Sequence, residues 1–568
     1  MKQNETLKLI FDKCFAGLIF VLIPFSFGFP ETIFINTYFV NVVLSIFIIL
    51  LCIRSFIEKE TLRISLFDIL FLLVICLSAF SSIIKNHPLQ SIVYISLLLY
   101  WGVFVLAKPF IPRLNIPIYL FYAIIFSNLY IIFRIGMLLL NNHNFTPYLE
   151  KHFANIGICA IFLAISSIVS LNRIYFSKRK IDLVLLPLIA INLILIVYLK
   201  SRISIFLIVI YFVFLLLKKV GFKSNIYKNI IFTLIAGSLF LFLLTGTKRA
   251  SSEGRTFILK ISTNVIKDNL LTGTGGFNTF PLYYPKYQAD YFSSGFGSEQ
   301  EIMLADNTKN ALNEPVQLLA ELGIIGFTLV LLLLIRTISL IRKESYLIKH
   351  LFFCLLFASC FYYVFHITLF QVILCSLILC VSYKDKIIFQ LTVPISVTVG
   401  LVILLLCTKS FYFSQSQFIH SLKIEKRISK GYTLVNKHNV LQAYFKDNPV
   451  FLTFYAHELF HKKKYAECLE TLNLIDQIYI HSELENLKGR LLSQMRKPED
   501  AELSYIRACN ICPNRFRYKY DLFKFYLENN QKSLAKNVAL EIHHLKEKIP
   551  SPASMAIKLE IERFLTSQ

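Results

Sequence analysis

The chain has 568 residues, of which 56% are hydrophobic, and its formal net charge is +24. Soluble domains carry fewer apolar residues, so this composition excludes a wholly soluble protein and indicates a membrane protein. Much of the positive charge lies in short loops between apolar runs, which indicates membrane topology rather than binding of nucleic acid.

Apolar runs recur through residues 1–407, and most are long enough to cross a bilayer about 30 Å thick. No small-residue cleavage site follows the first run, so we expect it to be a retained span rather than a signal peptide. As one helix, the stretch 350–383 would be about 51 Å long, so we expect a turn near Phe365 and His366 to divide it. The thirteen predicted spans are 15–29, 37–53, 66–84, 91–107, 116–136, 153–171, 181–199, 203–217, 229–246, 317–335, 350–366, 368–383 and 388–407.

Lys and Arg are concentrated in the loops on one side of these spans, which the charge rule assigns to the cytoplasm. The long polar loop 247–316 and the hairpin around Arg202 then face outward. With thirteen spans the tail also faces outward, whereas a single span at 350–383 would place the tail in the cytoplasm. The basic loops contain Arg54, Lys59, Arg63, Lys108, Arg113, Arg173, Lys178, Arg179, Lys180, Lys218, Lys219, Lys223, Lys228, Arg336, Arg342, Lys343, Lys349, Lys384 and Lys386.

We predict an all-α protein in two parts, a multi-span membrane domain at 1–407 and a soluble helical tail at 408–568. Small residues recur in the tail at Cys468, Ala501 and Ala535. This spacing resembles the tetratricopeptide family, whose repeat has about 34 residues. The resemblance implies stacked helix pairs that form a scaffold or bind a protein partner. Further matching positions are Leu452, Ala456, Leu459, Tyr465, Gly489, Tyr505, Ala508, Pro513 and Tyr526.

Two short motifs in the tail could indicate zinc binding or a redox role, but the expected helical packing favours neither. Residues 457–461 read HELFH, a pattern that can bind zinc on a helix. The repeat register turns Ala456 and Leu459 inward and both histidines toward solvent, and no third ligand is evident, so we expect no metal site. The CxxC at 509–512 admits a redox role, but packing within the repeat is the simpler interpretation.

Cationic residues mark the outer side of the membrane domain. Arg202 lies at the tight turn between the seventh and eighth spans, where an Arg either anchors at the interface or has a partner. Arg255 follows a short flexible stretch in the long loop, and Lys248 and Arg249 lie just upstream. Guanidinium groups bind phosphate in bidentate fashion and can neutralise a diphosphate leaving group.

Two further features of the long loop point to the same space. A helical run is expected to end near Asn269, and a glycine-rich turn, GTGGF, follows at 273–277. Asn313 is expected to cap the tenth span, with Pro315 in its first turn. That helix begins on the outer side, so its free N–H groups and positive dipole end face the arginines. No P-loop is present, so we expect no nucleotide and no cofactor.

Four motifs together resemble the O-antigen ligase/polymerase family of bacterial envelope membrane proteins. They are the SR after an apolar run, the SxGR before a helix, the GxGGF and the NExxQLLAELGIIG, and they cover roughly residues 180–345. The resemblance implies a metal-independent enzyme of the inner membrane whose donor is a polyprenyl-diphosphate-linked glycan. The implied acceptors are lipid A–core sugar, another glycan or a protein hydroxyl.

The resemblance also implies roles for individual residues. Arg202 and Arg255 would bind the diphosphate, and Glu314 would act in catalysis. The residues expected to contact substrate are Lys248, Arg249, Gly275, Gly276 and Asn313.

The chain departs from the family at Leu312, where the family usually has a His that acts as a base or positions the acceptor. Three alternatives follow. Glu314 takes the base role, because partial desolvation can raise the pKa of a carboxylate, although a first-turn helix acid is the simpler interpretation. Alternatively His143, His152 or His366 substitutes, or the protein is inactive.

The leading hypothesis is transfer of a glycan from undecaprenyl diphosphate to an acceptor hydroxyl, with a ligase preferred to a polymerase or a protein O-oligosaccharyltransferase. A second hypothesis is a non-catalytic membrane scaffold that acts through the repeat tail. A transporter is the third, but most spans lack the buried acidic or paired charges that ion-coupled transport commonly uses.

Overall fold

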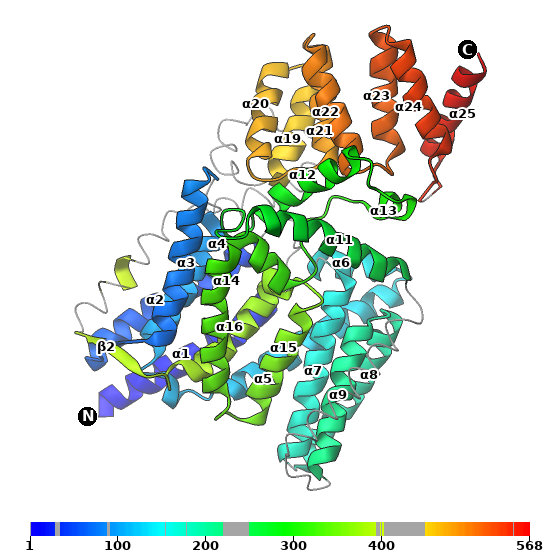
Figure 1. Ribbon diagram of the computed structural model, residues 1–568. Coiled ribbons are helices and arrows are strands. Elements are labelled where there is room, and N and C mark those ends of the chain that lie inside the picture. The colour runs from blue at the N-terminus through cyan, green and yellow to red at the C-terminus, as the bar shows by residue number, and fades with distance from the viewer. Residues whose placement is uncertain are drawn as a thin grey trace.

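The computed structural model describes residues 2–28, 35–87, 91–153, 155–177, 179–219, 249–392, 398, 400–402, 449–548 and 550–567 (Figure 1). Apart from one two-stranded ribbon, the elements in these ranges are helices. The prediction of an all-α, multi-span membrane protein is confirmed.

The first part of the chain consists of apolar helices. Six helical stretches among the described residues are long and apolar enough to cross a bilayer, and four further apolar helices are shorter. The predicted span 229–246 and most of 388–407 lie outside the described residues, so the total of thirteen stays a prediction. The helices are α1 (Lys2–Phe25), α2 (Ile35–Glu58), α3 (Leu66–Ile84), α4 (Ser91–Ala107), η2 (Ile111–Arg113), α5 (Ile116–Leu140), α6 (Thr146–Phe153), α7 (Ile156–Ser177), η3 (Lys180–Val184), α8 (Leu185–Tyr198), α9 (Arg202–Lys219), α14 (Glu314–Ile341), α15 (Tyr346–Ser359), η4 (Val364–His366) and α16 (Thr368–Ser382).

The predicted division of 350–383 is confirmed. Helix α15 ends at Ser359, the short η4 occupies Val364–His366, and α16 begins at Thr368. The residues 360–367 between α15 and α16 are called the connector below.

Several of the loops predicted to be basic meet at one end of the helices. Strand β1 (Leu62–Ser65) pairs antiparallel with β2 (Ile387–Leu391), although more than 300 residues separate them. Next to this ribbon the buried Lys108 donates to the buried Asp68. Charged pairs of this kind join loops that the sequence assigned to a single side of the membrane.

The described part of the long loop 247–316 contains α11 (Arg249–Asp268), α12 (Phe280–Ser293) and α13 (Glu299–Leu304). The expectation of one continuous tenth helix is wrong, because α14 has non-helical backbone at Gly323 (φ 65°, ψ −174°). At this kink Thr274 N donates to Ala320 O at 2.8 Å, and Ile324 N donates to Leu270 O at 2.8 Å. The backbone of the glycine turn therefore takes the hydrogen bonds that the helix gives up.

The tail forms antiparallel helix pairs, the yellow-to-red elements of Figure 1. The repeated small residues Cys468, Ala501 and Ala535 are fully buried, and Gly489 packs against the ring of Tyr505. This packing suits stacked pairs, while membership of the tetratricopeptide family stays a prediction. The tail helices are α19 (Pro449–His461), α20 (Tyr465–Asp476), α21 (Ser482–Gln494), α22 (Pro498–Ile511), α23 (Phe516–Glu528), α24 (Lys532–His544) and α25 (Pro552–Thr566).

The two tail motifs have packing roles in the structure. Ala456 and Leu459 are fully buried, as their register predicts. His461 is exposed, and His457 Nε2 lies 3.6 Å from Glu483 Oε1. Cys512 of the CxxC is buried in an apolar cluster with Leu282 of α12.

The tail lies against α12 and α13 of the long loop (Figure 1). Asn514 Nδ2 donates to Ala305 O at 2.7 Å, and Ile480 N donates to Pro281 O at 3.4 Å. Direct contact agrees with the expectation that the tail and the long loop lie on the same side of the membrane. The side on which the tail lies stays a prediction.

Candidate functional site

The site is built around the N-terminus of α14. Asn313 caps this helix, because its Oδ1 accepts from Val316 N at 3.1 Å, and Pro315 lies in the first turn, as predicted. Asn313 Nδ2 also donates to Cys360 O of the connector at 2.9 Å. The cap residue thus ties the start of α14 to the connector. The preceding Leu312 has φ +54°, a left-handed conformation that non-glycine residues rarely adopt.

Glu314 is the first residue of α14 and is only 1% exposed. Its Oε1 accepts from Phe365 N at 2.6 Å, and its Oε2 lies 3.1 Å from His366 Nδ1. A carboxylate buried to this extent needs partners, and both of them come from the connector. The position in the first helical turn is therefore only part of what Glu314 does.

His366 has polar neighbours on both ring nitrogens. Its Nε2 lies 2.9 Å from Gln317 Nε2, which also donates to Glu321 Oε1 at 3.1 Å. Gln317 Oε1 accepts from Ala311 N at 3.0 Å, and this bond turns the NH₂ group of the amide toward His366. In the neutral imidazole the contact favours a lone pair on Nε2 and a proton on Nδ1, next to Glu314.

The proton on His366 is subject to opposing influences. Burial disfavours the imidazolium, but the charge and hydrogen bond of Glu314 and the charge of Glu321 outweigh burial and raise the pKa of His366 to about 9. The histidine therefore holds a proton more strongly than a free imidazole does, in a connector that lies outside the apolar helices. Such a pair can take up a proton from a hydroxyl group once the imidazole is neutral.

Arg255 reaches the same connector from α11. Its Nη1 donates to Phe361 O at 2.9 Å, and its guanidinium lies 4.8 Å from the ring centre of Tyr362. Neither partner carries a negative charge, and no carboxylate among the described residues forms an ion pair with Arg255. Its positive charge is held in place, and within the part of the chain that the structure describes no ion pair neutralises it.

Arg202 begins α9 and is partly buried. The next residue, Ile203, belongs to a buried apolar cluster against which Phe361 and Tyr362 pack. The structure thus places Arg202 and Arg255 at the same end of the helices, and both lie on elements that pack against the connector.

The glycine turn packs against α3 and the residues that follow it. A Cβ atom on Gly275 would lie 2.7 Å from His87 Cδ2, and one on Gly276 would lie 2.5 Å from Ser82 Oγ of α3. Both residues have positive φ, 115° and 103°, so the turn needs glycine for its backbone and for this close packing. Their expected contact with substrate stays a prediction.

The remaining predicted residues fall into two groups. Lys248 and the side chain of Arg249 lie outside the described residues. Of the other histidine candidates, His143 is exposed and His152 Nδ1 lies 3.1 Å from Phe27 O. Only His366 of the three contacts a predicted site residue.

Comparison with known families finds a match for the part of the chain that holds most of the predicted site residues. Residues 157–331 match the family model described as O-antigen ligase. This part of the chain is similar to the O-antigen ligase family. The matched region contains Arg202, Arg255, the glycine turn and Glu314, whereas His366 and the tail lie beyond it. No curated protein matches the chain.

The residues that sequence reasoning missed are Gln317, Glu321 and the backbone of the connector. Gln317 and Glu321 lie on the same face of α14 as Glu314, at spacings of three and four residues, and this spacing is a usable signal. The connector acts through the carbonyls of Cys360 and Phe361 and the amide of Phe365. Backbone groups leave no mark in a sequence.

Proposed function

We propose that this protein transfers a glycan from an undecaprenyl-diphosphate-linked donor to an acceptor hydroxyl at the outer face of the bacterial inner membrane. The observation that carries the proposal is the convergence of Arg255, Asn313, Glu314 and His366 on one connector, beside a region similar to the O-antigen ligase family. Similarity to that family supports glycan transfer in a membrane.

In the proposed reaction Arg202 and Arg255 bind the diphosphate of the donor. Arg255 suits this role because it contacts a carbonyl oxygen and an aromatic ring, which leave its positive charge to a ligand. Charge builds on the leaving diphosphate as the glycosyl bond breaks, and a guanidinium held in place stabilises that charge without reorganising.

The acceptor side of the reaction uses Glu314 and His366. The acceptor oxygen forms a bond to the anomeric carbon of the donor sugar, the bond from that carbon to the diphosphate oxygen breaks, and the diphosphate leaves with the electron pair. The hydroxyl proton passes to the Glu314–His366 pair. His366 then takes the part of the His that the family usually has at the position of Leu312, from a different element of the fold.

The test replaces Arg255 with Ala and measures glycan attachment in cells that lack the native gene. Attachment is expected to fall at least 10-fold with a normal amount of protein in the membrane. Lys267→Ala is the matched control, because Lys267 is an exposed cation in the last turn of the same helix. Undiminished attachment with Arg255→Ala would rule the proposal out.

The glycan pattern of a null strain separates the related activities. Intact but unattached chains indicate a ligase, which we prefer because the tail could recruit an acceptor, whereas single repeat units indicate a polymerase. A normal pattern together with loss of a protein partner would favour the non-catalytic scaffold, the alternative that Leu312 supports.

A further inference from the structure

The segment 305–313 leads from α13 into the cap of α14 and has no helix or strand of its own. It ends at Asn313, directly before Glu314. Two short local bonds lie at its start, from Ala305 N to Glu301 O and from Thr308 N to Asp306 O, each 2.9 Å long. These local bonds do not fix the position of the segment relative to the rest of the molecule. Contacts with other elements must therefore hold it in place.

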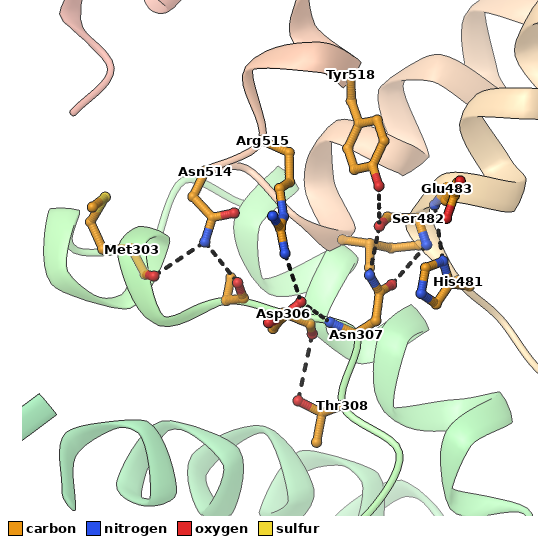
Figure 2. A network of polar contacts seen from close by, with 12 residues as sticks. Met303, Asp306, Asn307, Thr308, His481, Ser482, Glu483, Asn514, Arg515 and Tyr518 are labelled. Atoms are coloured by element: carbon orange, nitrogen blue, oxygen red, sulfur yellow. Dashed lines mark hydrogen bonds and ion pairs between the residues drawn. The ribbon is translucent and has the colours of Figure 1, made fainter. Parts of the chain in front are cut away.

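The tail supplies hydrogen bonds to the beginning of this segment (Figure 2). Asn514, which is 5% exposed, donates through Nδ2 to Met303 O at 3.2 Å and to Ala305 O at 2.7 Å. Arg515 Nη2 lies 3.4 Å from Asp306 Oδ1. One buried amide thus holds two carbonyls at the end of α13, where a helix has no partners of its own for them.

Asn307 and Ser482 form a reciprocal pair across the same interface (Figure 2). Ser482 N donates to Asn307 Oδ1 at 2.8 Å, and Asn307 Nδ2 donates to Ser482 Oγ at 2.9 Å. The Ser482 hydroxyl donates in turn to Tyr518 Oη at 3.2 Å. Each group of the pair is satisfied by the other, so a shift of the tail would break several bonds at once.

Helix α12 joins the tail to the segment from the other side. Gln288 is fully buried, and its Nε2 donates to Asp306 O at 3.0 Å and to Ile511 O of α22 at 2.5 Å. Around it, Leu282 and Ala289 of α12 pack with Ile480, Ile511 and Cys512 of the tail. A buried apolar patch around a side chain that donates to both elements is typical of a permanent contact rather than a passing one.

We infer that the tail positions the catalytic segment: the contacts of Asn514 and Ser482 with residues 303–307 hold the chain that carries Asn313 and Glu314. Leu312 supports this inference, because its left-handed backbone (φ +54°) persists only where the surroundings fix the chain on both sides. The cap and the connector fix the far side, and the tail fixes the near side. This face of the tail is therefore used by the protein itself and is closed to other partners.

The inference rests on the proposed function for its catalytic part, and hydrogen exchange tests its structural part separately. Asn514→Asp keeps the shape of the side chain but replaces both donor hydrogens, and Asn307→Ala breaks the pair from the loop side. The control is Asn473→Ala, at an exposed Asn of α20. All variants are measured in the full-length protein in detergent.

In both variants, amide exchange in residues 305–313 is expected to rise at least 10-fold, while exchange in the body of α14 and in α21 stays as in the control. The rate of glycan transfer at saturating donor is expected to fall at least 10-fold with the KM for the donor unchanged, because Arg202 and Arg255 belong to α9 and α11, outside the segment. General misfolding would instead raise exchange throughout the tail.

Unchanged exchange in 305–313 in both variants would overturn the inference. Increased exchange with transfer at the control rate would also overturn it, since the segment would be held by the tail without consequence. A wild-type protein that transfers no glycan would refute the proposed function instead, and the exchange experiment would still decide whether the tail holds the segment.

Discussion

Glu314 Oε2 lies 3.1 Å from Nδ1 of His366, which joins the first turn of α14 to the connector 52 residues further along the chain. Phe365 N donates to the same carboxylate at 2.6 Å. A carboxylate that holds a histidine in this way fixes the orientation of the ring and strengthens it as a base.

Replacing His366 with Gln is expected to slow glycan transfer by about 100-fold or more, the usual contribution of a general base. The amount of protein in the membrane should stay normal, because Gln keeps a polar group near Gln317. Transfer is measured with purified protein and a polyprenyl-diphosphate-linked glycan. His143→Gln is the control, since His143 is exposed and remote from the connector contacts. Full activity of His366→Gln would exclude His366 as the base.

The pH dependence of transfer should report the contact between Glu314 and His366. His366 acts as a base only when neutral, and its pKa is raised to about 9, so the wild-type rate should rise with pH up to that value. Glu314→Gln removes the charge that favours the imidazolium, so the rise should move to lower pH. The measurement is the rate at saturating substrate in a series of buffers. An identical profile for both proteins would contradict the coupling.

Gly323 should not tolerate a side chain. Its φ of +65° is costly for other residues, by about 1–3 kcal/mol, and a Cβ atom would collide with the backbone of Leu271 and Gly273. Gly323→Ala is therefore expected to lower the thermal unfolding temperature in detergent and to reduce transfer. Gly136→Ala in α5 is the control, because no atom lies within 4 Å of the added Cβ. Equal unfolding temperatures would show that the kink does not need glycine.

The ion pair between Lys108 and Asp68 lies at the opposite end of the helices from the site. Both side chains are buried, at 3% and 0% exposure, so Asp68→Ala would leave Lys108 buried without its partner. The expected loss of stability is about 3–5 kcal/mol. The double variant Asp68→Leu with Lys108→Met should recover much of it, because no charge is then buried. Thermal unfolding of the purified proteins measures the stability of the single and the double variant. A double variant that is no more stable than Asp68→Ala would contradict this account.

Sequence patterns predicted much of the site at the level of single residues. The cap at Asn313, the division of 350–383 and the glycine turn at 273–277 follow from local chemistry, and the structure has all three. The kink at Gly323 was missed, because LAELGIIG reads as a continuous apolar helix. Its cause is the backbone of residues 270–276, which lies 50 residues earlier in the chain.

The sequence by itself determined that this is a helical membrane protein with a polar loop and a helical tail, because span length, apolar runs and repeat spacing are local properties. Only the tertiary structure decided which histidine meets Glu314 and that the tail holds the loop. Those contacts join Glu314 to His366 and Asn307 to Ser482 through packing of separate helices. Several of the partners are backbone carbonyls and amides, which every residue has and which no sequence motif can mark.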